Sequence, residues 1–353
     1  MQSIRITLGL YNLVSTATMS HPYVNCYEVA PELGDIYGCS VHSKYACFAS
    51  SEGSLLTFPF SQIEPPYTAL KSEVANSGIH AISTSQTSKY CACVTFDGNV
   101  VVFDLQTGSE VVLKSVQTVK SPWSVKIADE ILFVASLDAD IVSIDIQKDE
   151  IVSKIRKSDA ACLSIDTAFN RTEVPNVVET KDKKPEVKQT EPVDESKNES
   201  NRPIMLLTAH SSNRVRITDV NTERVLYTLP THVSNVRKAV FSDSQTLACV
   251  VGDKSAALYV VRGAQYLGSL VHDAVVYDCA FSSDDSKLAT VDSSGTLRVY
   301  DVATLQVIFK QQVSDLPLFC VSFVQPFTPA IQGAAGGVVL SGADGVIRWF
   351  REA

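Results

Sequence analysis

One pattern, a tight turn followed by a strand with alternating apolar residues, recurs seven times along the 353 residues of this chain. The turn is made of small or polar residues, and apolar side chains recur at every second position of most of the strands. The copies are EGSLLTFPF (52–60), DGNVVVFDL (97–105), DADIVSIDI (138–146), SNRVRITDV (212–220), KSAALYVVR (254–262), SGTLRVYDV (294–302) and SGADGVIRWFREA (341–353). A chain of this length can form one body if it stacks copies of a small unit.

The spacing of the copies predicts a ring of repeated sheets. Between the turn residues Gly53, Gly98, Ala139, Asn213, Ser255, Gly295 and Gly345, the successive separations are 45, 41, 74, 42, 40 and 50 residues. Most of these separations lie near the period of about 40–45 residues that is typical of WD-repeat propellers, whose blades have four strands. We therefore predict an all-β fold, a seven-bladed WD-repeat β-propeller.

The separation of 74 residues contains a segment of different composition. Residues 171–202 include no aromatic residue and are rich in Glu, Lys, Asp and Pro. Such a segment buries too little apolar surface to fold. We predict one domain over residues 1–353, with a disordered insertion at about 171–202 that joins the first and second strands of blade four. It should leave the ring on the face opposite the starts of the inner strands.

The seventh copy ends after its third strand, so blade seven lacks a fourth strand from its own repeat. We predict that the N-terminal run SIRITLG, Ser3–Gly9, supplies it, because Ile4, Ile6 and Leu8 lie on one face of a strand. This arrangement removes two open sheet edges and ties both termini into the ring.

Charge, hydropathy and cysteine content exclude several classes of protein. The net charge of −9 disfavours direct nucleic-acid binding, which needs a basic surface. No run approaches the roughly 18 apolar residues that a membrane helix needs. The nine cysteines include no C-x-x-C pair, and most fall within apolar strand-like runs. Buried reduced thiols indicate a cytoplasmic protein, with the nucleus as a second location.

The sequence contains no recognisable catalytic, cofactor-binding or metal-ligating set. The six histidines lack metal-ligand spacing, and no Gly-rich phosphate loop or nucleophile elbow is present. The run Asp138-Ala139-Asp140 lies at a repeat turn and lacks the glycine and distal Glu of a calcium loop. His272 can be grouped with Thr290, Asp292 and Tyr300 in a buried structural network. We predict that the protein is not an enzyme; the alternative is a propeller hydrolase or lyase.

The candidate binding residues stand at the starts of the inner strands. When the repeats are aligned, these strands open with an apolar residue: Ile36, Ile79, Pro122, Val236, Val276 and Leu318. The next position should emerge at one mouth of the central channel. The residues there are Tyr37, His80, Trp123, Ala161, Arg237, Tyr277 and Phe319. This composition is typical of interface hot spots and predicts a platform for protein partners. The alternative is that the rings only fill the channel.

Several stretches resemble one family of propellers. The ending IRWFREA (347–353) is similar to the closing sequence of the WD-repeat subunit of the superkiller complex. The opening repeat DIYGCSVHSKYACFASSEGSLLTF (35–58) and the segments 215–242 and 268–282 also resemble that family. The similarity extends over the whole propeller, and its most distinctive parts are the IRWFREA ending and the order of the segments.

The resemblance implies a non-enzymatic scaffold in a complex with an RNA helicase and a tetratricopeptide-repeat protein. That complex feeds messenger RNA to the cytoplasmic exosome for 3′-to-5′ decay. In fungi the same subunit also contacts the topoisomerase-like protein that forms meiotic double-strand breaks. Partners dock on the top face through motifs with an Arg and a bulky apolar residue, and Trp123 matches a top-face Trp of the family, over which an Arg could stack. The alternative is an adaptor for a transcription-elongation or ubiquitin-ligase complex.

Overall fold

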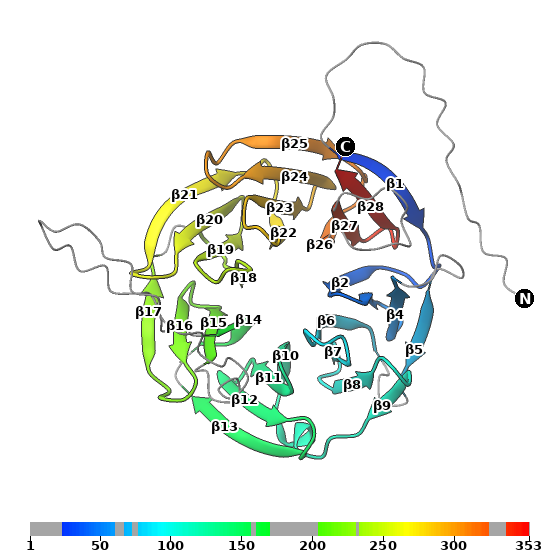
Figure 1. Cartoon of the computed structure of the whole chain (residues 1–353), viewed down its shortest axis with the longest axis vertical. Coiled ribbons are helices and arrows are strands. Elements are labelled where there is room, and N and C mark those ends of the chain that lie inside the picture. The colour runs from blue at the N-terminus through cyan, green and yellow to red at the C-terminus, as the bar shows by residue number, and fades with distance from the viewer. Residues whose placement is uncertain are drawn as a thin grey trace, which may run out of the picture.

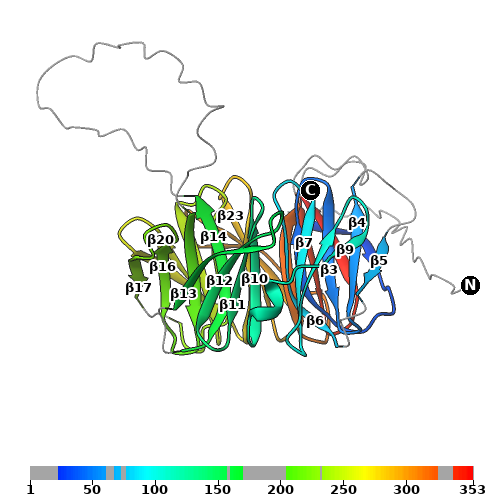
Figure 2. The ribbon, with the colours of Figure 1, turned by 90° about the horizontal axis from the view of Figure 1, so that it is seen from below.

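Seven four-stranded antiparallel sheets surround a central channel as the blades of a propeller (Figure 1). The computed structural model describes residues 23–60, 67–72, 77–156, 160–169, 204–230, 233–324 and 337–352. Seen from the side, the blades form a short cylinder (Figure 2). The prediction of an all-β, seven-bladed propeller is confirmed. Within these ranges no helix has the length and apolar character needed to cross a membrane.

Blades one to three follow one another along the chain, and each runs from an inner strand at the channel to an outer strand. Blade one contains β2 (Ile36–Val41), β3 (Tyr45–Ser50), β4 (Ser54–Pro59) and β5 (Thr68–Lys71). Blade two contains β6 (Ile79–Thr84), β7 (Tyr90–Thr95), β8 (Val100–Asp104) and β9 (Ser109–Val111). After the 3-10 turn η1 (Val116–Thr118), blade three contains β10 (Pro122–Ala128), β11 (Ile131–Ser136), β12 (Asp140–Asp145) and β13 (Glu150–Arg156).

Blades four to six repeat this order. Blade four contains β14 (Cys162–Phe169), β15 (Ile204–His210), β16 (Val215–Asp219) and β17 (Val225–Leu229). Blade five contains β18 (Lys238–Phe241), β19 (Leu247–Gly252), β20 (Ser255–Val260) and β21 (Gln265–Val271). Blade six contains β22 (Val276–Phe281), β23 (Lys287–Asp292), β24 (Thr296–Asp301) and β25 (Val307–Gln312). The insertion at 171–202 falls between β14 and β15, outside the described residues, and leaves from the end of β14 opposite to Cys162.

Blade seven is built from both ends of the described chain. It contains β26 (Leu318–Val324), β27 (Gly337–Gly342) and β28 (Ile347–Glu352), and its outer strand is β1 (Tyr23–Val29), antiparallel to β28. An N-terminal strand thus completes the blade as predicted, but the predicted segment was wrong. Ser3–Gly9 lies outside the described residues, and β1 holds the outer position.

The side chains of β1 explain why this segment closes the ring. Tyr23 is 2% exposed, and its ring centroid lies 5.4 Å from that of Phe309 in blade six. At the same distance, Tyr27 contacts Trp349 of β28. Only a short connection separates Val29 from the start of β2, so closing this loop costs little entropy.

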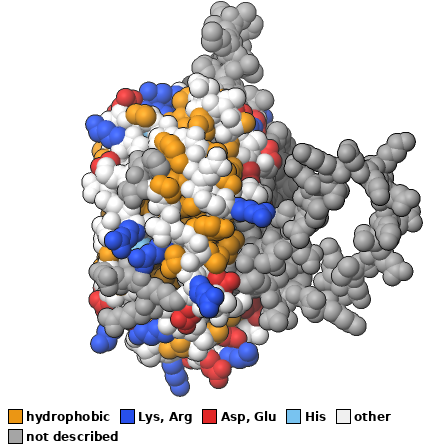
Figure 3. Space-filling model, turned by 90° about the vertical axis from the view of Figure 1, so that its left-hand side faces the viewer, with side chains coloured by type: hydrophobic (Ala, Val, Ile, Leu, Met, Phe, Trp, Pro, Cys, Tyr) orange, Lys and Arg blue, Asp and Glu red, His pale blue; other side chains and the backbone are white. Residues whose placement is uncertain are grey.

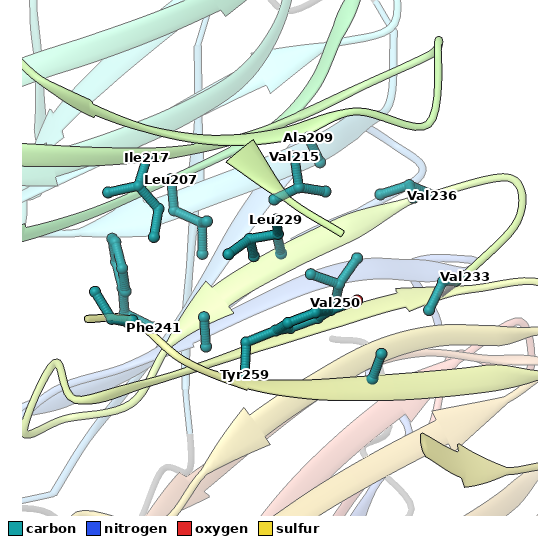
Figure 4. Packing of buried hydrophobic residues seen from close by; sticks show 14 of the residues in the cluster. Leu207, Ala209, Val215, Ile217, Leu229, Val233, Val236, Phe241, Val250 and Tyr259 are labelled. Carbon is teal, nitrogen blue, oxygen red and sulfur yellow. The ribbon is translucent and has the colours of Figure 1, made fainter. Parts of the chain in front are cut away.

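The apolar core lies between neighbouring blades. Middle strands such as β7 are buried along their whole length, because each sheet packs against a sheet on either side. Figure 4 shows the core between blades four and five, where Leu207 and Ile217 face Phe241 and Tyr259. The Tyr259 hydroxyl donates a hydrogen bond of 2.8 Å to the carbonyl oxygen of Pro230, which satisfies its polar end.

Neighbouring inner strands are joined by side chains, since they are not paired in one sheet. The hydroxyls of Ser40, Ser83, Ser124 and Ser164 each accept a hydrogen bond of 3.0–3.3 Å from a backbone N–H of the next blade. These bonds fix the blades around the channel and hence the positions of the residues at its mouth.

Candidate binding site at the channel mouth

Each inner strand begins with an irregular pairing that leaves one residue out of register. In six blades the register shows a β-bulge, which skips Tyr37, His80, Trp123, Leu163, Tyr277 and Phe319. In blade five, the N–H of Arg237 donates to the Val251 carbonyl while Lys238 pairs with the same Val251. A bulge redirects a side chain away from the regular pleat. All seven of these side chains line a central cavity of about 960 Å³.

The structure therefore places six of the seven residues aligned from the sequence at one mouth of the channel. The exception is blade four, where Ala161 was wrong by two positions. Cys162 is the buried residue that opens its inner strand, so the bulged residue that lines the cavity is Leu163. Ala161 instead accepts a backbone hydrogen bond from Ser211.

Side chains at the mouth form a continuous stack, which we call the aromatic arc. Its members, in spatial order, are Trp123, His80, Phe96, Tyr37, Phe319, Tyr277 and Arg237. Successive ring centroids lie 4.4, 4.8, 5.1, 5.2 and 5.3 Å apart. The Arg237 guanidinium lies 5.1 Å from the centre of the Tyr277 ring. Aromatic pairs at such distances contribute about 0.5–1.5 kcal/mol each beyond their area burial, so the arc is a preformed surface.

Phe96 was missed in the sequence because it lies in a turn and not in an inner strand. It follows β7, and its N–H donates to the carbonyl of Gly78. Its side chain is 51% exposed. Leu137 holds the equivalent position after β11 and is also exposed. The available signal was a large apolar residue directly before the turns at Asp97–Gly98 and Asp138–Ala139, where exposure has no packing reason.

The arc is electrically neutral at pH 7 except at Arg237. Burial lowers the pKa of His80 to about 4, so that its imidazole is uncharged. Its Nε2 atom is buried and has no hydrogen-bond partner among the described residues. Burial and the neighbouring Asp35 raise the pKa of Tyr37, whose hydroxyl donates to that carboxylate at 3.3 Å. The surface is thus aromatic, with one cation at its blade-five end.

Beneath the arc, two lysines of the channel are paired with carboxylates. Lys126 lies 2.8 Å from Asp166, and Lys238 lies 2.5 Å from Asp278. Each carboxylate also accepts a backbone hydrogen bond from the next blade, Asp166 from Phe241 and Asp278 from Val321. These pairs tie blades together and satisfy charges that the channel partly buries.

The network predicted around His272 is present. Its Nδ1 atom lies 3.4 Å from an Asp292 oxygen, and its Nε2 atom lies 3.4 Å from the Thr290 hydroxyl and 3.2 Å from that of Tyr300. Arg298, which was not among the residues predicted for this network, contacts His272 and pairs with Asp292 at 3.0 Å. His272 and Asp292 are buried beneath the surface, away from the arc.

Asp138–Asp140 forms the turn that was predicted, with Ala139 in the left-handed region at φ 67°. Over the part of the chain that the structure describes, no group of three His, Cys, Asp or Glu residues is arranged to hold a metal ion.

A second apolar surface lies on the outer wall of the ring. Figure 3 shows apolar side chains gathered on the side of the molecule where blades four and five lie. Exposed apolar residues there include Val225, Leu226, Tyr266, Leu267 and Val271. Two consecutive exposed apolar residues also occur at the start of the outer strands of blades three and six, Ile151 and Val152 in β13 and Val307 and Ile308 in β25. This surface therefore follows from the repeat, whereas the arc combines different residues from different blades.

Comparisons with known proteins agree with the repeat. The sequence model of the family "WD domain, G-beta repeat" matches residues 264–301, which span β21 to β24. The chain is also similar to an uncharacterized WD repeat-containing protein of Schizosaccharomyces pombe, with 23% identity over 131 residues. That similarity covers 37% of this chain and 33% of the relative, so the chain spans about a third of the length of the curated relative that it matches. The chain contains a WD40 repeat and folds as a seven-bladed β-propeller.

Proposed function

We propose that this propeller is a non-enzymatic adaptor that binds short segments of partner proteins at the aromatic arc. The observation that carries the proposal is the unbroken stack of rings from Trp123 to Tyr277, ending in the Arg237 guanidinium. Aromatic and Arg side chains dominate the energy of protein interfaces, and rigid aromatic rings lose little conformational entropy on binding. WD propellers generally bind protein partners, which agrees with this function.

The exposure of the arc argues against a purely structural plug. Phe96 is 51% exposed, and Arg237 is also exposed. Rings that serve only to fill a channel would be buried by one another. Residues of six blades contribute to the arc, so one bound segment could contact several blades at once.

The assembly that we propose is of the superkiller type. The IRWFREA ending and the order of the segments named above support it. In that assembly the arc would bind the tetratricopeptide-repeat scaffold and the RNA helicase, and the chain would support 3′-to-5′ messenger RNA decay in the cytoplasm. A second, nuclear role in meiotic double-strand break formation would use the same face. We expect no direct contact with nucleic acid and no membrane association.

The test is affinity purification of the tagged chain from its source cells, followed by mass spectrometry. The variants Trp123→Ala and Tyr277→Glu should reduce recovery of the helicase and scaffold by at least about 30-fold, the effect of losing a hot spot. The control is Tyr266→Ala, which removes an aromatic ring from the outer wall and should leave recovery unchanged.

Two outcomes would contradict the proposal at different levels. Recovery of helicase and scaffold with a Trp123→Ala, Tyr277→Glu double variant would exclude the arc as their binding site. Recovery of a transcription-elongation or ubiquitin-ligase complex, lost in the same variants, would retain the arc and replace the assembly.

A further inference from the structure

We propose that the segment bound at the arc presents a carboxylate to Arg237 and a bulky apolar side chain to Trp123. This inference rests on the proposed adaptor function and adds the chemistry of the partner. It follows from the pairing of charges around the cavity and from the different character of the two ends of the arc.

Arg237 differs from three lysines of the cavity because no carboxylate of the described residues lies within ion-pair distance of it. The cavity is also lined by Lys126, Lys238 and Lys287. Each of these forms an ion pair, with Asp166, Asp278 and Glu352 respectively. The Arg237 side chain forms neither an ion pair nor a hydrogen bond with the residues that the structure describes, and its guanidinium lies over the Tyr277 ring. A guanidinium that lies over a ring keeps the N–H donors in its own plane free to form hydrogen bonds.

The carboxylate of Asp253, which interacts with Arg237 electrostatically, is already engaged in hydrogen bonds. One of its oxygens accepts a hydrogen bond of 2.6 Å from Ser234, and the other accepts one of 2.9 Å from Asn235. Its carboxylate therefore holds the turn before β18 and makes no direct bond to Arg237. The donors of Arg237 remain available for an acceptor that comes from outside the chain.

The opposite end of the arc is apolar. Trp123 stacks on the uncharged His80, and the exposed Leu137 extends the same blade outwards. Blade four lies between Trp123 and Arg237 and contributes the aliphatic Leu163 at the mouth. A segment that contacts both ends can cross the mouth over blade four, where no ring stands in its path. An acidic side chain and an apolar anchor on one segment match these two ends.

The test uses the purified full chain and a random library of 12-residue peptides with amidated C-termini. Peptides retained by the chain should be enriched in Asp or Glu together with Trp, Phe, Leu or Met. Arg237→Gln should reduce the enrichment of acidic residues at least 10-fold, and Arg237→Glu should abolish that enrichment and select Lys or Arg instead. Arg262→Glu reverses an exposed charge in the turn before β21 and should change nothing. Nonspecific electrostatics cannot produce this result, since a chain with a net charge of −9 repels acidic peptides.

The outcomes separate this inference from the proposed function. Peptides that depend on Trp123 but carry no acid, or that keep their acid with Arg237→Glu, would overturn the inference alone. If no retained peptide is lost with Trp123→Ala, both proposals fail. A second library with free C-termini identifies the source of the carboxylate: acids fixed at the last position indicate a chain terminus, and internal acids support a side chain.

Discussion

Blade six and blade three use equivalent positions in opposite ways. In blade six the last residue of β23 is Asp292, which is buried and joins His272 to Arg298. In blade three the last residue of β11 is Ser136, and the next residue, Leu137, is exposed at the mouth. Blade six is stabilised by a buried polar network, whereas the equivalent turn of blade three exposes an apolar side chain near the mouth.

The comparison shows that the residues that define the repeat are largely different from those that we assign to binding. The family match at residues 264–301 covers His272, Thr290, Asp292 and Tyr300, which hold blade six together. Of the arc, only Tyr277 lies within the matched region. The residues that identify a blade are thus mostly separate from those we assign to recognition.

The largest effect is expected from breaking the network of blade six. Asp292→Ala would remove the buried carboxylate that pairs with Arg298 and would leave that guanidinium with the exposed Asp273 alone. It should reduce the free energy of unfolding by about 3 kcal/mol, the lower end of what breaking a buried ion pair costs. Urea denaturation measures this change. The control is Asp138→Ala in the exposed turn of blade three, expected to stay within about 0.5 kcal/mol. Equal effects of the two substitutions would remove the distinction between the blades.

A smaller effect concerns pH. Burial lowers the pKa of His80, His42 and His210 to about 4, whereas the unfolded chain protonates these histidines near their ordinary value of about 6.5. Between these values the unfolded state holds more protons, so stability falls as pH falls. Each histidine contributes a slope of up to about 1.4 kcal/mol per pH unit.

His80→Phe should therefore flatten the dependence of stability on pH between 6.5 and 4, with little change at pH 7. A phenyl ring can keep the stack with Phe96 and Trp123, and it removes the unpartnered Nε2 atom. Urea titrations at a series of pH values provide the measurement. An unchanged slope would show that His80 titrates normally in the folded protein.

The smallest effect is expected at the turn of blade three. Ala139 adopts φ 67°, a conformation that costs an alanine about 1–2 kcal/mol, whereas Gly98 and Gly295 adopt similar angles in blades two and six without this cost. Ala139→Gly should stabilise the fold by about 0.5 kcal/mol, after the greater flexibility of glycine in the unfolded chain is subtracted. Asn213→Gly in blade four should instead destabilise the fold by about 1 kcal/mol, because asparagine tolerates this conformation and its Oδ1 accepts a hydrogen bond of 3.1 Å from the Val236 N–H, which glycine would remove. Thermal unfolding of both variants checks the difference; a lower midpoint for Ala139→Gly would contradict it.

The blades could be predicted from the sequence because turns and alternating strands are local features. The closing strand was harder to locate. Both Ser3–Gly9 and Tyr23–Val29 contain apolar residues at strand spacing, and alternation alone does not show which one reaches the edge of β28. What decides is tertiary packing, through the contacts of Tyr23 with Phe309 and of Tyr27 with Trp349.

The site was predicted where the inner strands have a clear start and failed where they do not. At the start of β14 the sequence SDAACLSI has no strong alternation of apolar residues. The insertion at 171–202 also changes the distance to the next turn, so that this distance cannot be used to align the strand. A bulge also places two residues of one strand opposite one residue of its partner, so the alternation of side chains along the strand does not show which residue is bulged. An apolar residue directly before a turn marks Phe96 as unusual, but its contacts with His80 and Tyr37 depend on how that turn approaches the neighbouring blade, which the local pattern does not show.

The pairing of β1 with β28 has a consequence for the synthesis of the protein. Val29 can pair only after Ile347, its partner in the closing blade, has been translated. At about 5–20 residues per second this delay is roughly 16–65 s, during which β1 has no partner strand. Nascent chains in this interval expose an unpaired strand that can pair with other chains, so they are expected substrates for chaperones. The ring is thus completed in one late step, and its stability on the ribosome depends on the residues that arrive last in blade seven.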